Sequence, residues 1–455
     1  MENKKIDKSI KKALFFLRPE ILFAGVIFFA FCIWLITPEN VVFALTPLGK
    51  YISISSLLYV IISLIMFSAG AYLTADVFRH RIKRPIILEI LHDEKLFYNF
   101  ARHLTIIIYV ILILGILGNF ILLYNGFYAY GGALEFINAA YEGEESFGHL
   151  KRTYFGREQR VPGVTTLVFV MPIAAILSYL LTQTARKWGD ARLRWRGLIG
   201  IGASLIPGII ALTITQGSRT PILQVLVPLG FCHLFYALLV LQTPVKNILK
   251  ALATLGLAVV IVFAIGDYLR NYLQGYYGYY SVSKSLFESE GFLQGFIDNF
   301  MSYFYRTINN CFVIVDYFDV HSYTYRIFNF VYTAVDITKE GPKSPFVLIS
   351  NKMAYLEARG LAYFSTSNSG LLGYYFIDLG WFAIIIIFLL GCFLRFLYEG
   401  ILKFNFSCWL IYPLLCHPLL DAWRTDAISK IVSVMPLFFA VVITIYFRLM
   451  FPKLR

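Results

Sequence analysis

The stretch that decides the fold is LTIIIYVILILGILGNFILLY, from Leu104 to Tyr124, which contains no charged residue. A helix needs roughly 20 mostly apolar residues to cross a hydrocarbon layer about 30 Å thick, and this stretch has that length. Similar runs lie before and after it, and 58% of the 455 residues are hydrophobic. One soluble core cannot bury that much apolar surface, so the sequence predicts an all-α, polytopic integral membrane protein.

About ten transmembrane helices are predicted in a single membrane domain, residues 1–455, and nearly all of these spans lack charge. The exception is Asp378. The ninth span is short and contains Pro413 and Pro418, so a helix that ends inside the membrane is the alternative there. The predicted spans are residues 21–37, 52–74, 104–124, 164–184, 198–215, 221–241, 251–266, 370–394, 407–420 and 431–447.

The net charge of +13 comes from short Lys and Arg clusters between the apolar runs. We interpret this charge as a topology signal rather than as a nucleic-acid-binding surface. With a cytoplasmic N-terminus, most of the 40 Lys and Arg residues lie in cytoplasmic segments, and both termini are expected there. Residues 1–20 are basic and lack a small-residue cleavage signal, so the first span is expected to be retained.

Two external segments follow from this topology, a first loop at residues 126–163 and a large helical loop at 267–369. The large loop holds nearly half of the 31 Tyr residues, which suit an interfacial aromatic belt or a sugar-stacking surface. Within it, Phe292 to Phe318 has phenylalanines at i, i+4 steps and predicts an amphipathic helix. We expect this helix on the outer membrane surface, apolar side down, presenting Arg306 and Asn309.

The sharpest local motif is Gln216 to Pro221, QGSRTP, a tight external turn between two apolar runs. Thr220 suits a helix N-cap and Pro221 suits the first turn, so backbone N–H groups point outward beside Arg219. Together with Ser218, these groups predict an anion site, because a guanidinium grips a phosphate through two parallel hydrogen bonds. An arginine that snorkels at a helix end is the alternative.

Arg306 and Arg424 are the next external candidates, and a loop salt bridge is the alternative for each. Cysteine and histidine spacing gives no support to a metal site or a disulfide framework. The sequence does not choose a catalytic base among the external Asp336, Glu340, Glu357, Asp421, Asp426 and His321.

The pattern resembles the bacterial O-antigen repeat-unit polymerases, which are multi-span enzymes with a large external loop late in the chain. The resemblance covers roughly residues 215–437. Related O-antigen ligases have a histidine-containing motif where this chain has Asn368, which favours a polymerase. The matching motifs are Gly217-Ser218-Arg219 with Gly230, Tyr305-Arg306-Thr307, Ser367 to Gly380, and Trp423-Arg424.

The resemblance implies glycosyl transfer between undecaprenyl-diphosphate-linked oligosaccharides at the periplasmic face of the bacterial inner membrane, in O-antigen and lipopolysaccharide biosynthesis. Its expected partners are those lipid-linked oligosaccharides, membrane lipid and a chain-length regulator, with no nucleic acid. No metal and no other cofactor is expected, because guanidinium groups stabilise the departing diphosphate. The predicted catalytic residues are Arg219, Arg306 and Arg424, and the predicted substrate-binding residues are Ser218, Asn309, Asn368 and Asp426.

Three alternatives remain open. An O-antigen ligase uses the same chemistry on another acceptor. A lipid-linked oligosaccharide flippase or ion-coupled transporter would place ionisable residues at mid-membrane and often shows repeated halves. A structural or assembly subunit would tolerate replacement of all three arginines.

Overall fold

The computed structural model of the protein describes residues 8–78, 86–129, 131–135, 165–214, 220–250, 253–254, 256–257, 261, 281–319, 345–362, 369–424, 428 and 431–451. The secondary structure of these residues is helical throughout, which confirms the all-α class. Within the described residues, 8 helical stretches are long and apolar enough to cross a membrane. The protein is therefore a multi-pass helical membrane protein.

The spanning stretches coincide with eight of the predicted spans. The predicted seventh span, 251–266, lies almost wholly outside the described residues. The spanning stretches lie in α2 (Pro19–Ile36), α4 (Ile54–Phe78), α6 (Glu94–Ala129), η1 with α9 (Thr165–Val170, Met171–Lys187), α10 (Ala191–Ile214), α11 (Thr220–Leu239), α16 through η3 to α17 (Gly370–Leu379, Gly380–Phe382, Ala383–Leu402) and α19 (Ile431–Met450). The shorter helices are α1 (Lys8–Phe16), α3 (Glu39–Leu45), α5 (Ile86–His92) and α15 (Pro345–Ala358).

The predicted ninth span forms α18 (Phe406–Leu420), a helix of 15 residues. At 1.5 Å per residue its length is about 22 Å, which is less than the thickness of a hydrocarbon core. Pro413 and Pro418 both lie inside it, and Trp409 and Tyr412 are fully buried. Because surrounding helices enclose it, α18 is a core helix whose C-terminal turn ends within the bundle.

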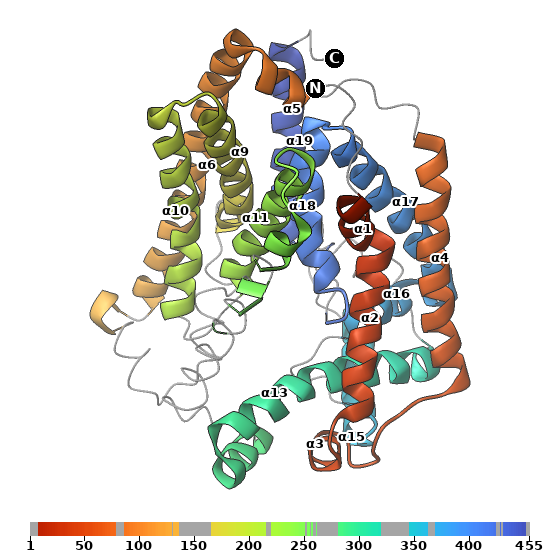
Figure 1. Ribbon diagram of the computed structural model, residues 1–455. Coiled ribbons are helices and arrows are strands. Elements are labelled where there is room, and N and C mark those ends of the chain that lie inside the picture. Colours follow the sequence, from red (N-terminus) through yellow and green to blue (C-terminus); the bar gives the residue numbers. More distant parts are fainter. Residues whose placement is uncertain are drawn as a thin grey trace.

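Figure 1 shows two groups of upright helices, α6, α9, α10 and α11 on one side and α2, α4 and α17 on the other, with α18 and α19 between them. Helices α4 and α17 approach very closely at two glycines. A Cβ on Gly70 would lie 2.2 Å from the carbonyl oxygen of Phe388, and one on Gly391 would lie 2.2 Å from that of Phe67. Small residues allow such backbone contact between membrane helices.

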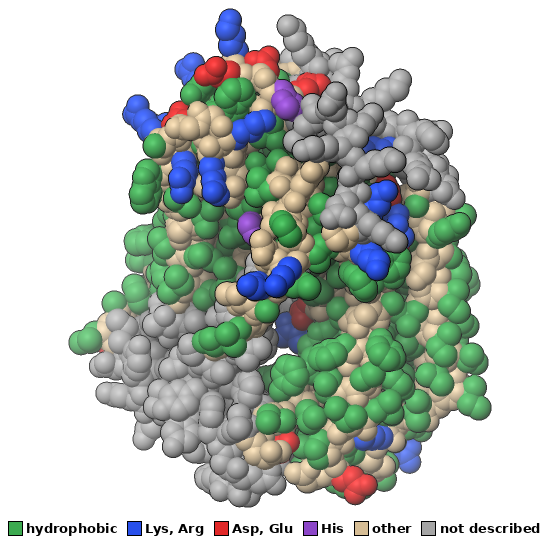
Figure 2. Space-filling model, in the orientation of Figure 1, with side chains coloured by type: hydrophobic (Ala, Val, Ile, Leu, Met, Phe, Trp, Pro, Cys, Tyr) green, Lys and Arg blue, Asp and Glu red, His purple; other side chains and the backbone are tan. Residues whose placement is uncertain are grey.

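The two ends of the bundle differ in charge. Lys and Arg side chains gather at the end that carries the α9–α10 turn (Figure 2), and α19 ends on the same side (Figure 1). We call this the basic end. The positive-inside rule predicts that the basic end faces the cytoplasm.

Helix α13 (Ser281–Tyr317) lies across the other end, below α10 and α11 and crossing the lower part of α2 (Figure 1). It includes the predicted amphipathic helix but starts earlier. From Ser302 onward α13 is buried on both sides, since Asn309 is fully buried and Arg306 is 4% exposed on its polar side. The apolar row is buried as well, with Phe304, Ile308 and Phe312 at 6%, 8% and 1% exposed. This corrects the expected orientation, in which Arg306 and Asn309 faced outward. The reason is that α13 packs against α2, α3, α4 and α16, which surround its polar groups.

A buried ionic cluster joins α2 to α17. Arg395 Nη1 lies 2.6 Å from Glu20 Oε1, and Arg395 Nη2 lies 2.6 Å from Glu399 Oε1. Tyr398, which directly precedes Glu399, donates a hydrogen bond to the carbonyl of Leu14 at 2.6 Å. The predicted spans stop just short of these charged residues, so the sequence interpretation missed that they are buried.

Candidate functional site

The turn after α18, Asp421 to Arg424, meets the N-terminus of α16. The backbone N–H of Leu371 donates to the carbonyl of Ala422 at 2.7 Å, and that of Gly370 donates to the carbonyl of Arg424 at 3.2 Å. Gly370 has φ +66°, and a Cβ there would lie 2.7 Å from the carbonyl oxygen of Trp423. Only glycine fits both demands. Two predicted motifs that are distant in the sequence therefore meet here.

Arg424 is held by Asp421 through two hydrogen bonds. Nε donates to Oδ1 and Nη2 donates to Oδ2, each at 2.8 Å. The negative charge of Asp421 raises the pKa of Arg424 above its ordinary value, so the guanidinium stays charged. The side chain of Arg424 is still 34% exposed. The salt bridge that was the alternative for Arg424 is present, but it uses only two of the five N–H donors of a guanidinium.

Helix α13 is joined to this turn by aromatic side chains. Trp423 stacks on Phe304, with ring centroids 3.8 Å apart and planes 12° apart. The neighbouring Tyr303 has its ring centroid 5.2 Å from Cζ of Arg306. Its phenol also contributes to the electrostatic environment of Arg424. Arg306 and Arg424 therefore both lie next to the Phe304–Trp423 stack, Arg306 two residues after Phe304 and Arg424 directly after Trp423.

Arg306 belongs to a buried polar stripe on α13. Its Nε donates to the carbonyl of Ser302 at 3.2 Å, and its Nη2 donates to Ser302 Oγ at 2.6 Å. Asp298 lies one turn earlier at the same i, i+4 spacing, so the three side chains share a face. Oδ1 of Asp298 accepts from Gln294 Nε2 at 3.0 Å, whereas Oδ2 is buried without a hydrogen-bond partner in the described part of the chain.

A buried carboxylate oxygen without a partner is costly, and such groups concentrate at functional sites. Asp298 is a candidate site residue that the sequence interpretation missed, although its spacing from Ser302 and Arg306 was a usable signal. Among the earlier base candidates, Asp421 is engaged by Arg424 and Glu357 lies on α15. The others lie outside the described residues: Asp336, Glu340, Asp426 and His321.

Two residues beside Arg306 fix the position of α13. Asn309 donates from Nδ2 to the carbonyl of Leu361 at 2.9 Å and accepts at Oδ1 from the backbone N–H of Tyr51 at 2.8 Å. The hydroxyl of Tyr305 is hydrogen-bonded to that of Thr46, and burial raises the pKa of Tyr305 to about 12. Because backbone partners occupy its amide, we place Asn309 in the support of the site rather than in contact with substrate.

An open apolar groove of about 410 Å³ runs along α2 to the Phe304–Trp423 stack. Phe16, Leu22 and Gly25 also line this groove. Phe16 is 63% exposed, and a Cβ on Gly25 would meet nothing within 4 Å. The groove therefore links the lipid-facing side of α2 to the Phe304–Trp423 stack.

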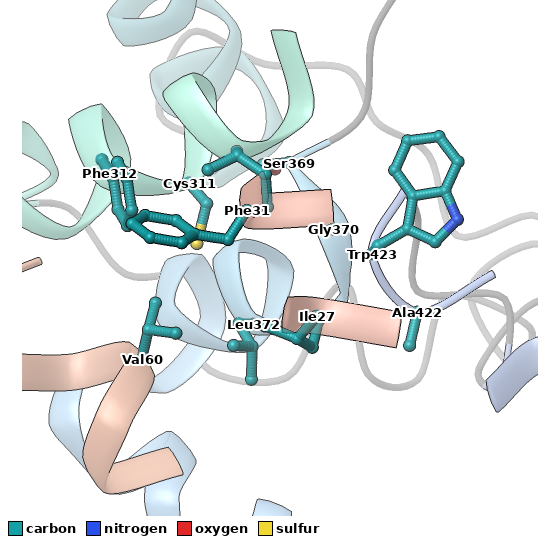
Figure 3. A pocket seen from close by; sticks show the side chains of 11 residues that line it. Ile27, Phe31, Val60, Cys311, Phe312, Ser369, Gly370, Leu372, Ala422 and Trp423 are labelled. Carbon is teal, nitrogen blue, oxygen red and sulfur yellow. The ribbon is translucent and has the colours of Figure 1, made fainter. Parts of the chain in front are cut away.

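A second cavity next to the stack is too small for a substrate. Figure 3 shows Phe31 beside Phe312 and Cys311 of α13, Ile27 beside Leu372, and Trp423 at the edge. Its volume is about 30 Å³, room for about one water molecule, whereas ligand sites usually span several hundred Å³. We interpret it as a packing void.

Four predicted site residues lie outside the described residues: Ser218, Arg219, Asn368 and Asp426. The neighbouring α11 begins at Thr220. It runs antiparallel to α18, because Tyr236 lies against Trp409 and Phe235 against Tyr412. The start of α11 therefore faces the same end of the bundle as the turn that carries Arg424.

Fold and site define a polytopic α-helical membrane protein with an apolar groove that ends at the Phe304–Trp423 stack, next to which Arg306 and Arg424 follow in the sequence. Within the described ranges, no group of three or more His, Cys, Asp or Glu is arranged to hold a metal ion. No protein-family model matches the sequence, and neither a curated protein nor a solved structure does.

Proposed function

We propose that the protein is a repeat-unit polymerase of surface polysaccharide (O-antigen) biosynthesis, which transfers an undecaprenyl-diphosphate-linked glycan onto another lipid-linked repeat unit. The observation that carries this proposal is the Phe304–Trp423 stack at the end of the apolar groove, with Arg306 and Arg424 close to it in the sequence on two different elements. A polyprenyl diphosphate has the matching chemistry, a long apolar chain that ends in two phosphates.

The two arginines act on the leaving group. In the transfer, the bond between the anomeric carbon and the phosphate oxygen breaks, and negative charge develops on the departing diphosphate. Guanidinium groups held in place before the reaction stabilise that charge without reorganisation. Arg424 is held in this way by Asp421, and Arg306 is held by Ser302 and the ring of Tyr303.

The acceptor hydroxyl forms the new glycosidic bond and gives up its proton. Asp298 is our candidate for the base, because its Oδ2 lacks a hydrogen-bond partner and it shares the polar face of α13 with Arg306. Arg219 lies outside the described residues and stays a predicted member of the diphosphate site on its sequence motif alone.

The depth of the site supports a lipid-linked substrate. Helix α18 is about 22 Å long, so its C-terminal turn does not reach the full thickness of a hydrocarbon core of about 30 Å. In the proposal Arg424 lies just below the headgroup region, close enough to contact the diphosphate of a membrane-anchored lipid. Charge interactions are stronger there than in bulk water.

The test is elongation of lipid-linked repeat units by the purified full-length protein. Arg424→Ala and Arg306→Ala are each expected to lower the rate by about 100-fold or more, as loss of one charge-stabilising donor does. The matched control is Arg359→Ala, an exposed arginine at the end of α15 that stacks on Tyr355. Wild-type rates for both variants would contradict the proposal.

One observation favours a second function. The buried cluster of Arg395, Glu20 and Glu399 places charges inside the bundle, as ion-coupled transporters do. Movement of a lipid-linked oligosaccharide by this chain in protein-free vesicles, without elongation, would favour a flippase. Transfer of finished polymer to a different lipid acceptor would favour a ligase.

A further inference from the structure

A second basic site lies at the other end of the bundle, between α6 and α10. An open cavity of about 490 Å³ is lined there by Arg102, Arg192 and Arg196, with Tyr98 and Tyr109 in its walls. It is separate from the arginine pair beside α13, because it lies at the basic end. The proposed glycosyl transfer does not use it.

Among the described residues, the arginines of this cavity have no acidic partner. Within the part of the chain that the structure describes, none of the three forms a salt bridge. The acidic residue in the wall is Asp190, whose Oδ1 accepts from the backbone N–H of Leu193 at 2.9 Å and so caps α10. The cavity therefore has an excess of positive charge, and its guanidinium donors are available to an anion.

Apolar side chains continue from the arginines toward the middle of the bundle. Helix α6 enters from the basic end, so Ile106 and Tyr109 lie one and two turns deeper than Arg102. Ile106 is 53% exposed and Tyr109 is 44% exposed. This order, cations first and apolar surface next, matches a membrane phospholipid, whose phosphate lies at the interface and whose acyl chains point inward.

We propose that this cavity binds one anionic phospholipid through its phosphate. The lipid belongs to the membrane leaflet at the basic end. The three arginines contact the phosphate, and the acyl chain lies against Ile106 and Tyr109. Basic pockets between membrane helices on the cytoplasmic side are suited to such headgroups. The bound lipid bridges α6 and α10 at their basic ends.

The experiment is native mass spectrometry of the full-length protein from nanodiscs of equal phosphatidylglycerol and phosphatidylcholine. Wild-type protein is expected to retain phosphatidylglycerol selectively. Each arginine contributes about fivefold near an anionic surface, so Arg102→Ala with Arg196→Ala lowers retention by more than tenfold. The matched control, Arg194→Ala, removes an exposed arginine of α10 that does not line the cavity, and it leaves retention unchanged.

Equal retention of the two lipids by wild-type protein would overturn the proposal, and so would undiminished retention by the double variant. Binding of inorganic phosphate without retention of phosphatidylglycerol would also overturn it, because the ligand would then be free phosphate rather than a lipid. If the double variant fails to fold, the proposal is tested by the melting temperature of the wild-type protein with added lipid. A saturable rise in melting temperature with phosphatidylglycerol supports the proposal, and an equal rise with phosphatidylcholine overturns it.

Discussion

Phe304 of α13 and Trp423 of the turn after α18 stack with ring centroids 3.8 Å apart. Arg424 directly follows Trp423, and Arg306 is two residues beyond Phe304. The stack therefore sets the distance between the two arginines, since it joins a helix at the end of the bundle to a turn within it. If the arginines act on one diphosphate, their catalytic power depends on this contact.

Replacing Trp423 should therefore affect transfer more than stability. We expect Trp423→Ala to lower the elongation rate by about 100-fold, the cost of displacing a catalytic group by about 1 Å. Trp423→Phe should recover part of the rate, because an aromatic pair is retained. Initial rates and thermal unfolding of the two variants are compared with Phe438→Ala, which removes a side chain of α19 that is 58% exposed. A fall in rate that merely follows the loss of folded protein would argue against this role.

The geometry of Arg424 should matter as well as its charge. Arg424→Lys keeps a cation but cannot make the two parallel hydrogen bonds to Asp421. We expect about a tenfold loss of elongation rate, since one charge-assisted hydrogen bond is worth about 1.5 kcal/mol. Arg359→Lys is the matched control. Full activity of Arg424→Lys would mean that charge alone is sufficient.

Filling the apolar groove should hinder a long lipid chain without disturbing the fold. A Cβ on Gly25 meets nothing within 4 Å, so Gly25→Phe places a ring in the groove without a clash. We expect a rise in KM of about tenfold for polyprenyl-linked donors and much less for short-chain analogues, because only the long chain occupies the groove. Gly202→Phe on α10 is the control, since Gly202 is equally unobstructed and lies outside the groove. Equal effects of the two variants would remove the groove from the substrate path.

Asp298 should be needed for the proton-transfer step. Asp298→Asn keeps the hydrogen-bonding shape beside Gln294 but removes the base, and we expect the rate to fall by about 100-fold to 10,000-fold. Donor binding should persist, because Arg306 and Arg424 are unchanged. Rate and donor affinity are measured separately, with Asp319→Asn near the end of α13 as the control. Loss of binding together with rate would indicate a structural role for Asp298.

The cluster of Arg395, Glu20 and Glu399 should contribute to stability. Arg395→Met leaves two buried carboxylates without their cation, and breaking a buried pair in this way costs about 3–5 kcal/mol of unfolding free energy. Glu20→Gln removes one of the two negative charges and leaves the Arg395–Glu399 pair intact, so its cost is smaller. Unfolding in detergent measures both variants, and a larger effect of Glu20→Gln would contradict this order.

The spanning helices and the charge bias between the ends of the bundle could be predicted from the amino-acid sequence. Each span is a local run, and lipid as solvent requires that every backbone group in it be satisfied within a helix. The helical state of α13 was also local, because its phenylalanine row has the period of one helical face. Arg306 and Arg424 were chosen as candidates on the same local grounds.

Only the tertiary structure decided which way α13 faces, what Arg395 binds and which residues meet Arg424. Helices α2, α3, α4 and α16 enclose α13 so that its polar and apolar sides are both buried from Ser302 on, and an amphipathic pattern alone does not tell this. The pairing of Arg395 with Glu20 joins residues 375 positions apart. The stack of Phe304 on Trp423 likewise depends on where α18 ends within the bundle, and that is a matter of packing between helices rather than of any local pattern.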